Sequence, residues 1–247
     1  MRFFIELSYN GKAYHGWQYQ PNAISVEEVV EDGLSKLLKT KIDIIAAGRT
    51  DAGVHAKQMF AHFDYAEGFD SEQIIYKLNA FLPNDISIQN IFQVKNETHA
   101  RFDALSRTYN YKIALKKDVF NREGSYYIKY PLDVEKMNEA AKILFDYRNF
   151  KCFSRSNTDV KTYNCDIMIA EWNQTNFDLV FTIKADRFLR NMVRAIVGTM
   201  LDVGFGKTTI EEFHDIIKSE NRVKAGASVP AQGLYLSVIE YNKNILI

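Results

Sequence analysis

The sequence predicts an α+β protein built of two related, ferredoxin-like halves with mainly antiparallel sheets. In the first half, residues 1–105, alternating segments typical of strands and amphipathic segments typical of helices follow the order β-α-β-β-α-β, the split-βαβ arrangement. The second half, residues 106–247, gives a looser repeat of such elements. We therefore expect two α+β halves whose sheets are either joined or facing each other.

The first half is predicted to contain two helices between its strands. Ser25, with Glu28 three residues later, forms a capping box at the start of the first helix. Ser71 is expected to cap the second helix and Pro83 to end it. The predicted strands are 2–9, 42–47, 57–64 and 86–94.

The second half is predicted to contain three helices. One begins at Asp133, a long one spans about 186–202, and a short one opens with the capping box Thr208…Glu211. A polar turn at 173–175 joins two strands. The predicted strands are 107–115, 126–130, 165–172, 176–184 and 233–241.

The composition is that of an ordinary globular protein, with 47% hydrophobic and 25% charged residues in a chain of 247. No apolar run reaches the roughly 20 residues that cross a bilayer, and the first residues lack the features of a signal peptide. The only cysteines, Cys152 and Cys165, provide neither a disulfide framework nor a CxxC zinc pair. A cytoplasmic protein with reduced thiols is the simplest interpretation.

The formal net charge is zero, which argues against a strongly basic nucleic-acid binder. The charge is nevertheless unevenly distributed. Residues 1–105 carry 10 basic and 14 acidic residues, and residues 106–247 carry 21 and 17, so the halves differ by −4 against +4. This polarity is compatible with a local phosphate-binding face in the second half.

The run from Gly48 to Ala56 (GRTDAGVHA) is the segment that most directly indicates a reactive group. Asp51 lies near two glycines on a tight turn that leaves an apolar strand, with Arg49 two residues before it. A neighbouring arginine favours and orients the ionised carboxylate, which is what a nucleophilic carboxylate needs. A glycine-rich turn with a local ion pair explains the spacing equally well.

The predicted helix 186–202 contains three arginines. Arg187, Arg190 and Arg194 are spaced by three and four residues and would share one face, which Gly198 continues. Nearly every other position is apolar, and a buried helix rarely directs an arginine at anything but a partner. That partner is an internal carboxylate, a phosphate, or both.

A pair of tyrosines and two arginines mark the junction of the halves. Tyr109 and Tyr111 would point to the same face of a strand, near Arg101 and Arg107. Tyrosines beside arginines suit base stacking and phosphate contact. The same pattern is also that of a normal amphipathic strand.

The loop at 14–18 (YHGWQ) combines aromatic residues with a turn glycine. It could present stacking surfaces, or Trp17 could cover an edge of the core. No GxxxxGK[ST] or GxGxxG segment occurs, which disfavours nucleoside triphosphate and dinucleotide chemistry.

A metal site is a further hypothesis for the region around Asp51. His55, His62 and Asp64 follow it closely, and His62 and Asp64 alternate on one strand face. No HExxH or His-x-His pattern is present, so a metal-dependent hydrolase remains a minor alternative.

The chain resembles the tRNA pseudouridine synthase A family, whose members isomerise uridines in the anticodon stem-loop of tRNA. The resemblance extends nearly end to end, and AGRTDAGVHA is its most specific segment. The matching segments occur in the family's order, at 9–18, 47–56, 78–86, 99–111, 188–198 and 229–236.

The resemblance implies a role for five residues. Asp51 matches the catalytic nucleophile, and Arg49 matches an arginine associated with tRNA binding and opening of the stem-loop. Tyr109 matches the tyrosine that packs on the target base. Arg194 matches the basic residue that pairs with the catalytic aspartate, and Leu234 matches a small apolar pocket position.

The resemblance also implies the pseudouridine synthase fold, with two halves meeting at a central active-site cleft. It implies a homodimer without metal or cofactor that acts on tRNA positions 38, 39 and 40, with no membrane attachment. A non-catalytic RNA-binding module, in which Asp51 merely pairs with Arg194, is the alternative from a different functional class.

Overall fold

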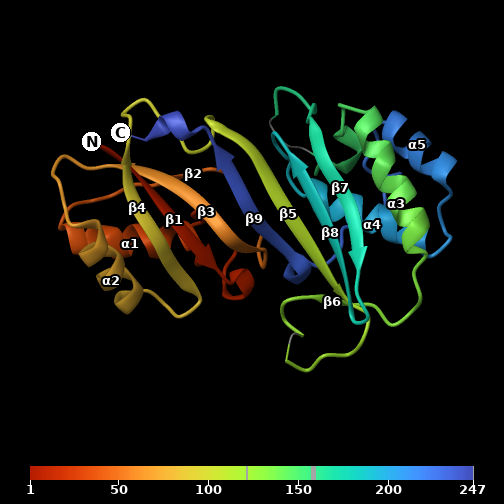
Figure 1. Ribbon diagram of the computed structural model, residues 1–247, viewed down its shortest axis with the longest axis horizontal. Helices are drawn as coiled ribbons and strands as arrows, with labels where there is room; N and C mark the ends of the chain where they lie inside the picture. Colours follow the sequence, from red (N-terminus) through yellow and green to blue (C-terminus); the bar gives the residue numbers. More distant parts are fainter. Residues whose placement is uncertain (121, 157–159, 247) are drawn as a thin grey trace. The chain divides into compact units, whose positions relative to one another are not determined.

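The structure is a computed structural model that describes residues 1–120, 122–156 and 160–246. The chain divides into two compact units (Figure 1). Unit 1 comprises Met1–Ser106 and Tyr235–Ile247, and unit 2 comprises Arg107–Leu234. Both contain helices and a mostly antiparallel sheet, so the predicted α+β class is confirmed.

The sheet of unit 1 has the order β4-β1-β3-β9, with the short β2 paired to β3. β1 pairs antiparallel with both β3 and β4, whereas β3 and β9 are parallel through His55↔Tyr235 and Ala56↔Leu236. Figure 1 shows α1 and α2 side by side. The elements are β1 (Arg2–Tyr9), α1 (Val26–Leu38), β2 (Ile45–Ala46), β3 (His55–Asp64), α2 (Ser71–Phe81), β4 (Ile86–Val94) and β9 (Leu234–Tyr241).

The two units differ from the predicted halves in the placement of the last strand, β9. The sequence places a boundary at 105/106 and assigns everything after it to the second half. Because β9 pairs with β3, residues 235–247 belong to the first unit instead. Unit 1 is thus assembled from two separate stretches of chain.

Two local predictions for unit 1 are wrong. Asp70, rather than Ser71, caps α2, its side chain accepting the Gln73 N–H at 3.1 Å. The predicted strand 42–47 reduces to the two residues of β2. Side chains of α1 explain this, because Ser35 Oγ accepts the Ile42 N–H at 2.9 Å and Glu31 Oε1 accepts the Ile44 N–H at 2.8 Å.

The sheet of unit 2 has the order β5-β8-β7, with neighbouring strands antiparallel and β6 paired to β5. The helix α3 packs against β7 and α4. The elements are β5 (Ala104–Ala114), β6 (Tyr126–Tyr127), α3 (Val134–Ile143), β7 (Ile167–Gln174), β8 (Asp178–Ala185), α4 (Met192–Gly204) and α5 (Ile210–Lys218).

The long helix begins later than predicted. Asn191 adopts a left-handed conformation with φ of 66°, and α4 starts at Met192. Arg187 and Arg190 therefore precede the helix, and only Arg194 lies on it, so the predicted face of three arginines is wrong. The capping box of α5 is likewise shifted by one residue, to Thr209 and Glu212.

Both cysteines are free and buried, and burial raises the pKa of each thiol to about 12. In the described part of the chain, no helix combines the length and the apolar character needed to cross a membrane.

Gly198 is where α4 touches the segment 225–229. A Cβ at Gly198 would lie 1.8 Å from the Ala227 carbonyl oxygen, so even one methyl group requires backbone movement. We expect Gly198→Ala to destabilise the protein by about 1–3 kcal/mol, as overpacked cores do. Thermal unfolding should show a melting temperature lower by roughly 2–4 °C per kcal/mol. In Gly68→Ala, where a Cβ would meet nothing within 4 Å, the melting temperature should stay unchanged. Equal losses of melting temperature in the two variants would contradict the interpretation.

Candidate active site

The turn that carries Asp51 is fixed by hydrogen bonds both before and after this residue. Before it, the Thr50 carbonyl accepts the Trp17 N–H at 3.2 Å; after it, the Gly53 N–H donates to the Tyr14 carbonyl at 3.2 Å. Val54 N–H closes the turn onto the Asp51 carbonyl at 3.1 Å. The carboxylate therefore stands on a backbone that is held from residues 14 to 17.

Two glycines allow this close approach. A Cβ at Gly16, where φ is 92°, would lie 2.4 Å from the Thr50 carbonyl oxygen. At Gly11 it would lie 2.0 Å from the Val54 carbonyl oxygen. Only a residue without a side chain fits at either position, which explains the glycines of the segment 9–18.

The aromatic loop at 14–18 supports the turn rather than presenting a stacking surface. Tyr14 and Trp17 are only 5% and 1% exposed. Trp17 Nε1 donates to Glu27 Oε1 at 3.2 Å, which ties the loop to α1. Of the two sequence interpretations, the covered core edge is the one that the structure confirms.

Asp51 is half-buried and Arg49 is exposed. Within the described residues, Arg49 forms no ion pair with Asp51, so the local pair suggested by their spacing is absent. Arg49 is instead exposed to solvent.

The residues of the metal hypothesis are engaged elsewhere. His55 Nδ1 accepts the Gly11 N–H at 3.1 Å, and His62 Nδ1 accepts the Ala100 N–H at 3.2 Å. Burial lowers the pKa of His62 to about 4. Asp64 forms a salt bridge with Arg2 at 2.8 Å. Among the residues that the structure covers, no group of three potential ligands gathers, and the metal hypothesis gains no support.

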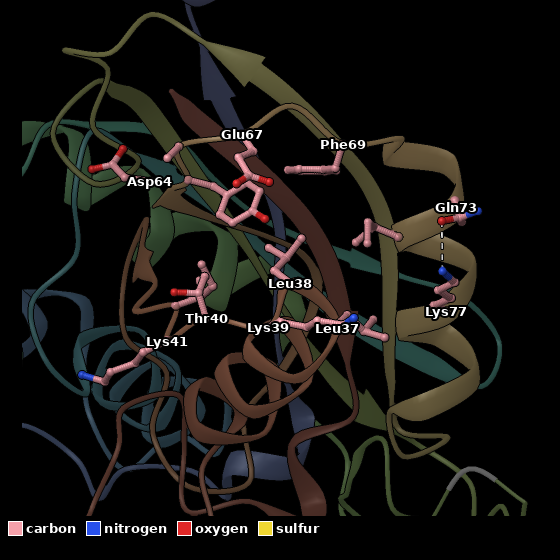
Figure 2. Close-up of a pocket in the computed structure, with 14 residues that line it drawn as sticks. Leu37, Leu38, Lys39, Thr40, Lys41, Asp64, Glu67, Phe69, Gln73 and Lys77 are labelled. Carbon is pink, nitrogen blue, oxygen red and sulfur yellow. Dashed lines mark hydrogen bonds between the residues drawn. The ribbon is translucent and has the colours of Figure 1, made fainter.

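A cavity of about 670 Å³ lies at the far end of β3 from the Asp51 turn (Figure 2). Asp64 lines it, and the nine-residue rise along β3 from His55 separates it from the turn by about 30 Å. A smaller hollow of about 450 Å³ lies beside the turn, lined by Tyr9, His55 and Asp85 among others. Asp51 lines neither of these two hollows.

In unit 2 the two tyrosines of β5 have different environments. Tyr111 is fully buried, and its hydroxyl donates to the Pro230 carbonyl at 2.9 Å, so it is a core residue. Tyr109 is half-buried and lies edge-on to Phe188, with ring centroids 5.1 Å apart. The side chain that remains partly accessible is thus the one that matches the family's tyrosine.

The nearby arginines divide in a similar way. Arg107 Nη1 donates to the Asp186 carbonyl at 2.8 Å, and this contact anchors the loop before α4. Arg101, in unit 1, is exposed and lies over the ring of Phe102. Arg107 therefore has a structural contact, whereas Arg101 remains accessible.

Arg194 lies in the first turn of α4, where the sequence predicts a functional arginine. Its Nε donates to the Val229 carbonyl at 2.8 Å, which fixes the side chain while leaving it half-buried. Leu234, 5% exposed, begins β9. Arg49 and Asp51 thus lie two residues apart in unit 1, whereas Tyr109, Arg194 and Leu234 belong to unit 2.

Sequence reasoning missed the segment that holds Arg194. Arg222 donates to the carbonyls of Ala225 and Gly226 and, at 2.9 Å, to Ser228 Oγ. These bonds shape the segment that ends at Val229. The only signal in the sequence is the match at 229–236, which indicates no partner.

Comparisons with known proteins show the family of this chain. The sequence profile of a family described as tRNA pseudouridine synthase matches residues 7–103 and 140–242. A tRNA pseudouridine synthase A of Bacteroides fragilis is 53% identical over 246 residues, covering 99% of this chain and 98% of that protein. The one of Parabacteroides distasonis is 52% identical, covering 99% and 97%. The one of Thermoanaerobacter sp. is 39% identical, covering 96% and 98%.

The family match and these relatives define an isomerase that acts on tRNA. The chain belongs to the tRNA pseudouridine synthase family.

Proposed function

We propose that this pseudouridine synthase acts on uridines 38, 39 and 40 of the tRNA anticodon stem-loop, with Asp51 as its nucleophile. The observation that carries the proposal is the turn around Asp51, which is bonded on both sides to residues 14–17. A half-buried carboxylate on a fixed backbone loses little freedom when it attacks, and such positioning is a large part of catalysis.

The reaction itself needs only a nucleophile and a place to turn the base. The N1–C1′ bond of uridine breaks, the uracil turns, and C5 bonds to C1′. The C5 proton is released, N1 takes up a proton, and the bond formed by the carboxylate breaks again. Atoms and electrons balance without an oxidant, a reductant or an energy source, so we propose neither metal nor cofactor. The carboxylate attacks either C6 of the ring or C1′ of the ribose.

The other site residues would hold the Asp51 carboxylate and bind the target uridine and the RNA backbone. In this proposal Arg194 keeps Asp51 ionised, because an opposite charge favours the carboxylate. The uridine must leave its stack, which costs a few kcal/mol. Stacking on Tyr109, worth roughly 1–3 kcal/mol, offsets that cost, and Leu234 gives the pocket an apolar wall. Arg49 contacts the RNA backbone.

The resemblance supports two further proposals. The protein acts as a homodimer. It works in the cytoplasm, where tRNA is modified. Because the net charge is zero, tRNA binding must depend on local groups such as Arg49 and Arg101, both of which are exposed.

Product analysis on defined tRNAs tests the substrate assignment. We expect pseudouridine in tRNAs that carry uridine at position 38, 39 or 40, and none in the same tRNAs with cytidine there. Nuclease digestion and chromatography of nucleosides, with position mapping, measures this. Bound but unmodified tRNA would favour the RNA-binding module, and modification outside the anticodon stem-loop would contradict the proposal.

A further inference from the structure

We propose that Tyr14 and Asp85 are positioning residues for Asp51, joined by a side-chain hydrogen bond that fixes the catalytic turn. This inference rests on the proposed role of Asp51. It also assigns a function to Asp85 within the matching segment 78–86, for which neither the sequence nor the reaction supplies one.

The contacts form a continuous path inside unit 1. The Tyr14 hydroxyl donates to Asp85 Oδ1 at 2.6 Å, and the Tyr14 carbonyl accepts the Gly53 N–H at 3.2 Å. The Tyr14 N–H donates to the Gly11 carbonyl at 3.0 Å. Tyr14 is thus held at its ring, its N–H and its carbonyl, and the last of these bonds reaches the turn two residues after Asp51.

Asp85 is itself well anchored. Its carbonyl accepts the Asn10 N–H at 2.8 Å, and Ile86 N–H donates to the Pro83 carbonyl at 3.0 Å immediately before β4. The backbone of Asp85 is therefore held both at the start of β4 and by the segment 9–18. Its carboxylate thus provides a fixed acceptor for the Tyr14 hydroxyl.

The side-chain bond is of a strong kind. A short hydrogen bond to an ionised carboxylate is roughly twice as strong as one between neutral groups. The Tyr14 ring is 5% exposed, so water reaches it poorly. Burial and then the Asp85 carboxylate raise the pKa of Tyr14, so the hydroxyl keeps its proton and remains a donor throughout the neutral range.

The hydrogen bond from the Gly53 N–H to the Tyr14 carbonyl determines what changes when Tyr14 is no longer held. Gly53 has φ of 77°, and Val54 closes the turn onto the Asp51 carbonyl. Movement of the Gly53 N–H therefore reorients the carboxylate. Because Arg49 is exposed and lies before the turn, contact with the RNA backbone is preserved. The expected defect is in kcat and not in KM.

The experiment combines kinetics with a local structural measurement. We expect Tyr14→Phe and Asp85→Ala each to lower kcat by about 10–100-fold, the range for a misplaced reactive group, with KM within about threefold. The double variant should be no slower than the slower single one, because both remove the same bond. Asp85→Asn, which retains an acceptor, should recover most of kcat. Tritium release from 5-tritiated uridine in tRNA measures these rates.

Two matched variants control for general damage. Tyr147→Phe removes a comparable hydroxyl bond, 2.8 Å to His214 Nδ1, and Asp64→Ala removes a carboxylate bonded to Arg2. Both should keep wild-type kcat. Unchanged kcat in the Tyr14 and Asp85 variants, multiplicative losses in the double variant, or no recovery with Asp85→Asn would each overturn the proposal.

Hydrogen exchange at the Gly53 amide tests this inference independently of the proposed function. The Gly53 amide should exchange faster in Tyr14→Phe and Asp85→Ala than in the wild type, whatever residue is the nucleophile. Unchanged exchange there overturns the positioning role. Retained turnover in Asp51→Asn, with faster Gly53 exchange in the Tyr14 variant, overturns the role of Asp51 instead.

Discussion

Asp51→Asn is expected to abolish pseudouridine formation while tRNA binding stays within about threefold, because the amide keeps the size of the side chain but is no nucleophile. The turn should survive, since its hydrogen bonds on either side involve the backbone of residues 14–17, 50, 53 and 54 and not the carboxylate. Tritium release from 5-tritiated uridine measures the chemistry, and filter binding measures the affinity for tRNA.

Asp43→Asn provides the matched control. Asp43 is exposed, lies two residues before β2 and pairs with Lys41 at 2.8 Å. Its amide variant should retain full turnover. Detectable product from Asp51→Asn after long incubation would exclude a nucleophilic role for this carboxylate, unless mass spectrometry finds the asparagine deamidated to aspartate.

Arg194→Ala should lower turnover by about 10²–10⁴-fold, the size of effect seen when one preorganised charged or donor group is lost. Alanine removes the cation that, in the proposed function, holds and orients the Asp51 carboxylate. Single-turnover rates of the variant and of the wild type measure this.

Two variants separate charge from packing. Arg194→Lys keeps the charge but loses the Nε–H bond to the Val229 carbonyl, so it should recover part of the rate. Arg148→Ala, which removes an exposed arginine beside Asp166, should be fully active. A folded and fully active Arg194→Ala protein would show that this arginine only braces the segment 225–229.

Alternation and spacing predicted most elements of the fold. The strand 86–94 and the strand 2–9 have the predicted bounds, because each has a regular apolar pattern and pairs across a sheet. The start of α4 was missed because Asn191 enters a left-handed conformation, which an apolar pattern does not reveal. Nor does a strand's own sequence identify its partner, so the return of β9 to unit 1 could not be foreseen.

The candidate site could be proposed from sequence where its residues are close neighbours in the chain. Arg49 and Asp51 lie two residues apart, and their residue types indicate the chemistry. The support of the Asp51 turn was not predictable, since the bond between Tyr14 and Asp85 spans 71 residues and no periodicity connects them. Sequence alone also did not decide the role of the aromatic loop at 14–18, because Trp17 is equally suited to stacking and to burial.

The parallel pairing of β3 with β9 has a consequence for biosynthesis. His55 follows Asp51 by four residues, and its strand partner Tyr235 is translated only after all of unit 2. Domains generally fold as units while the chain emerges from the ribosome. Unit 2 is continuous and can do so, whereas unit 1 must keep the edge of β3 open until β9 arrives. A nascent chain interrupted anywhere within unit 2 therefore carries the Asp51 turn on an incomplete sheet.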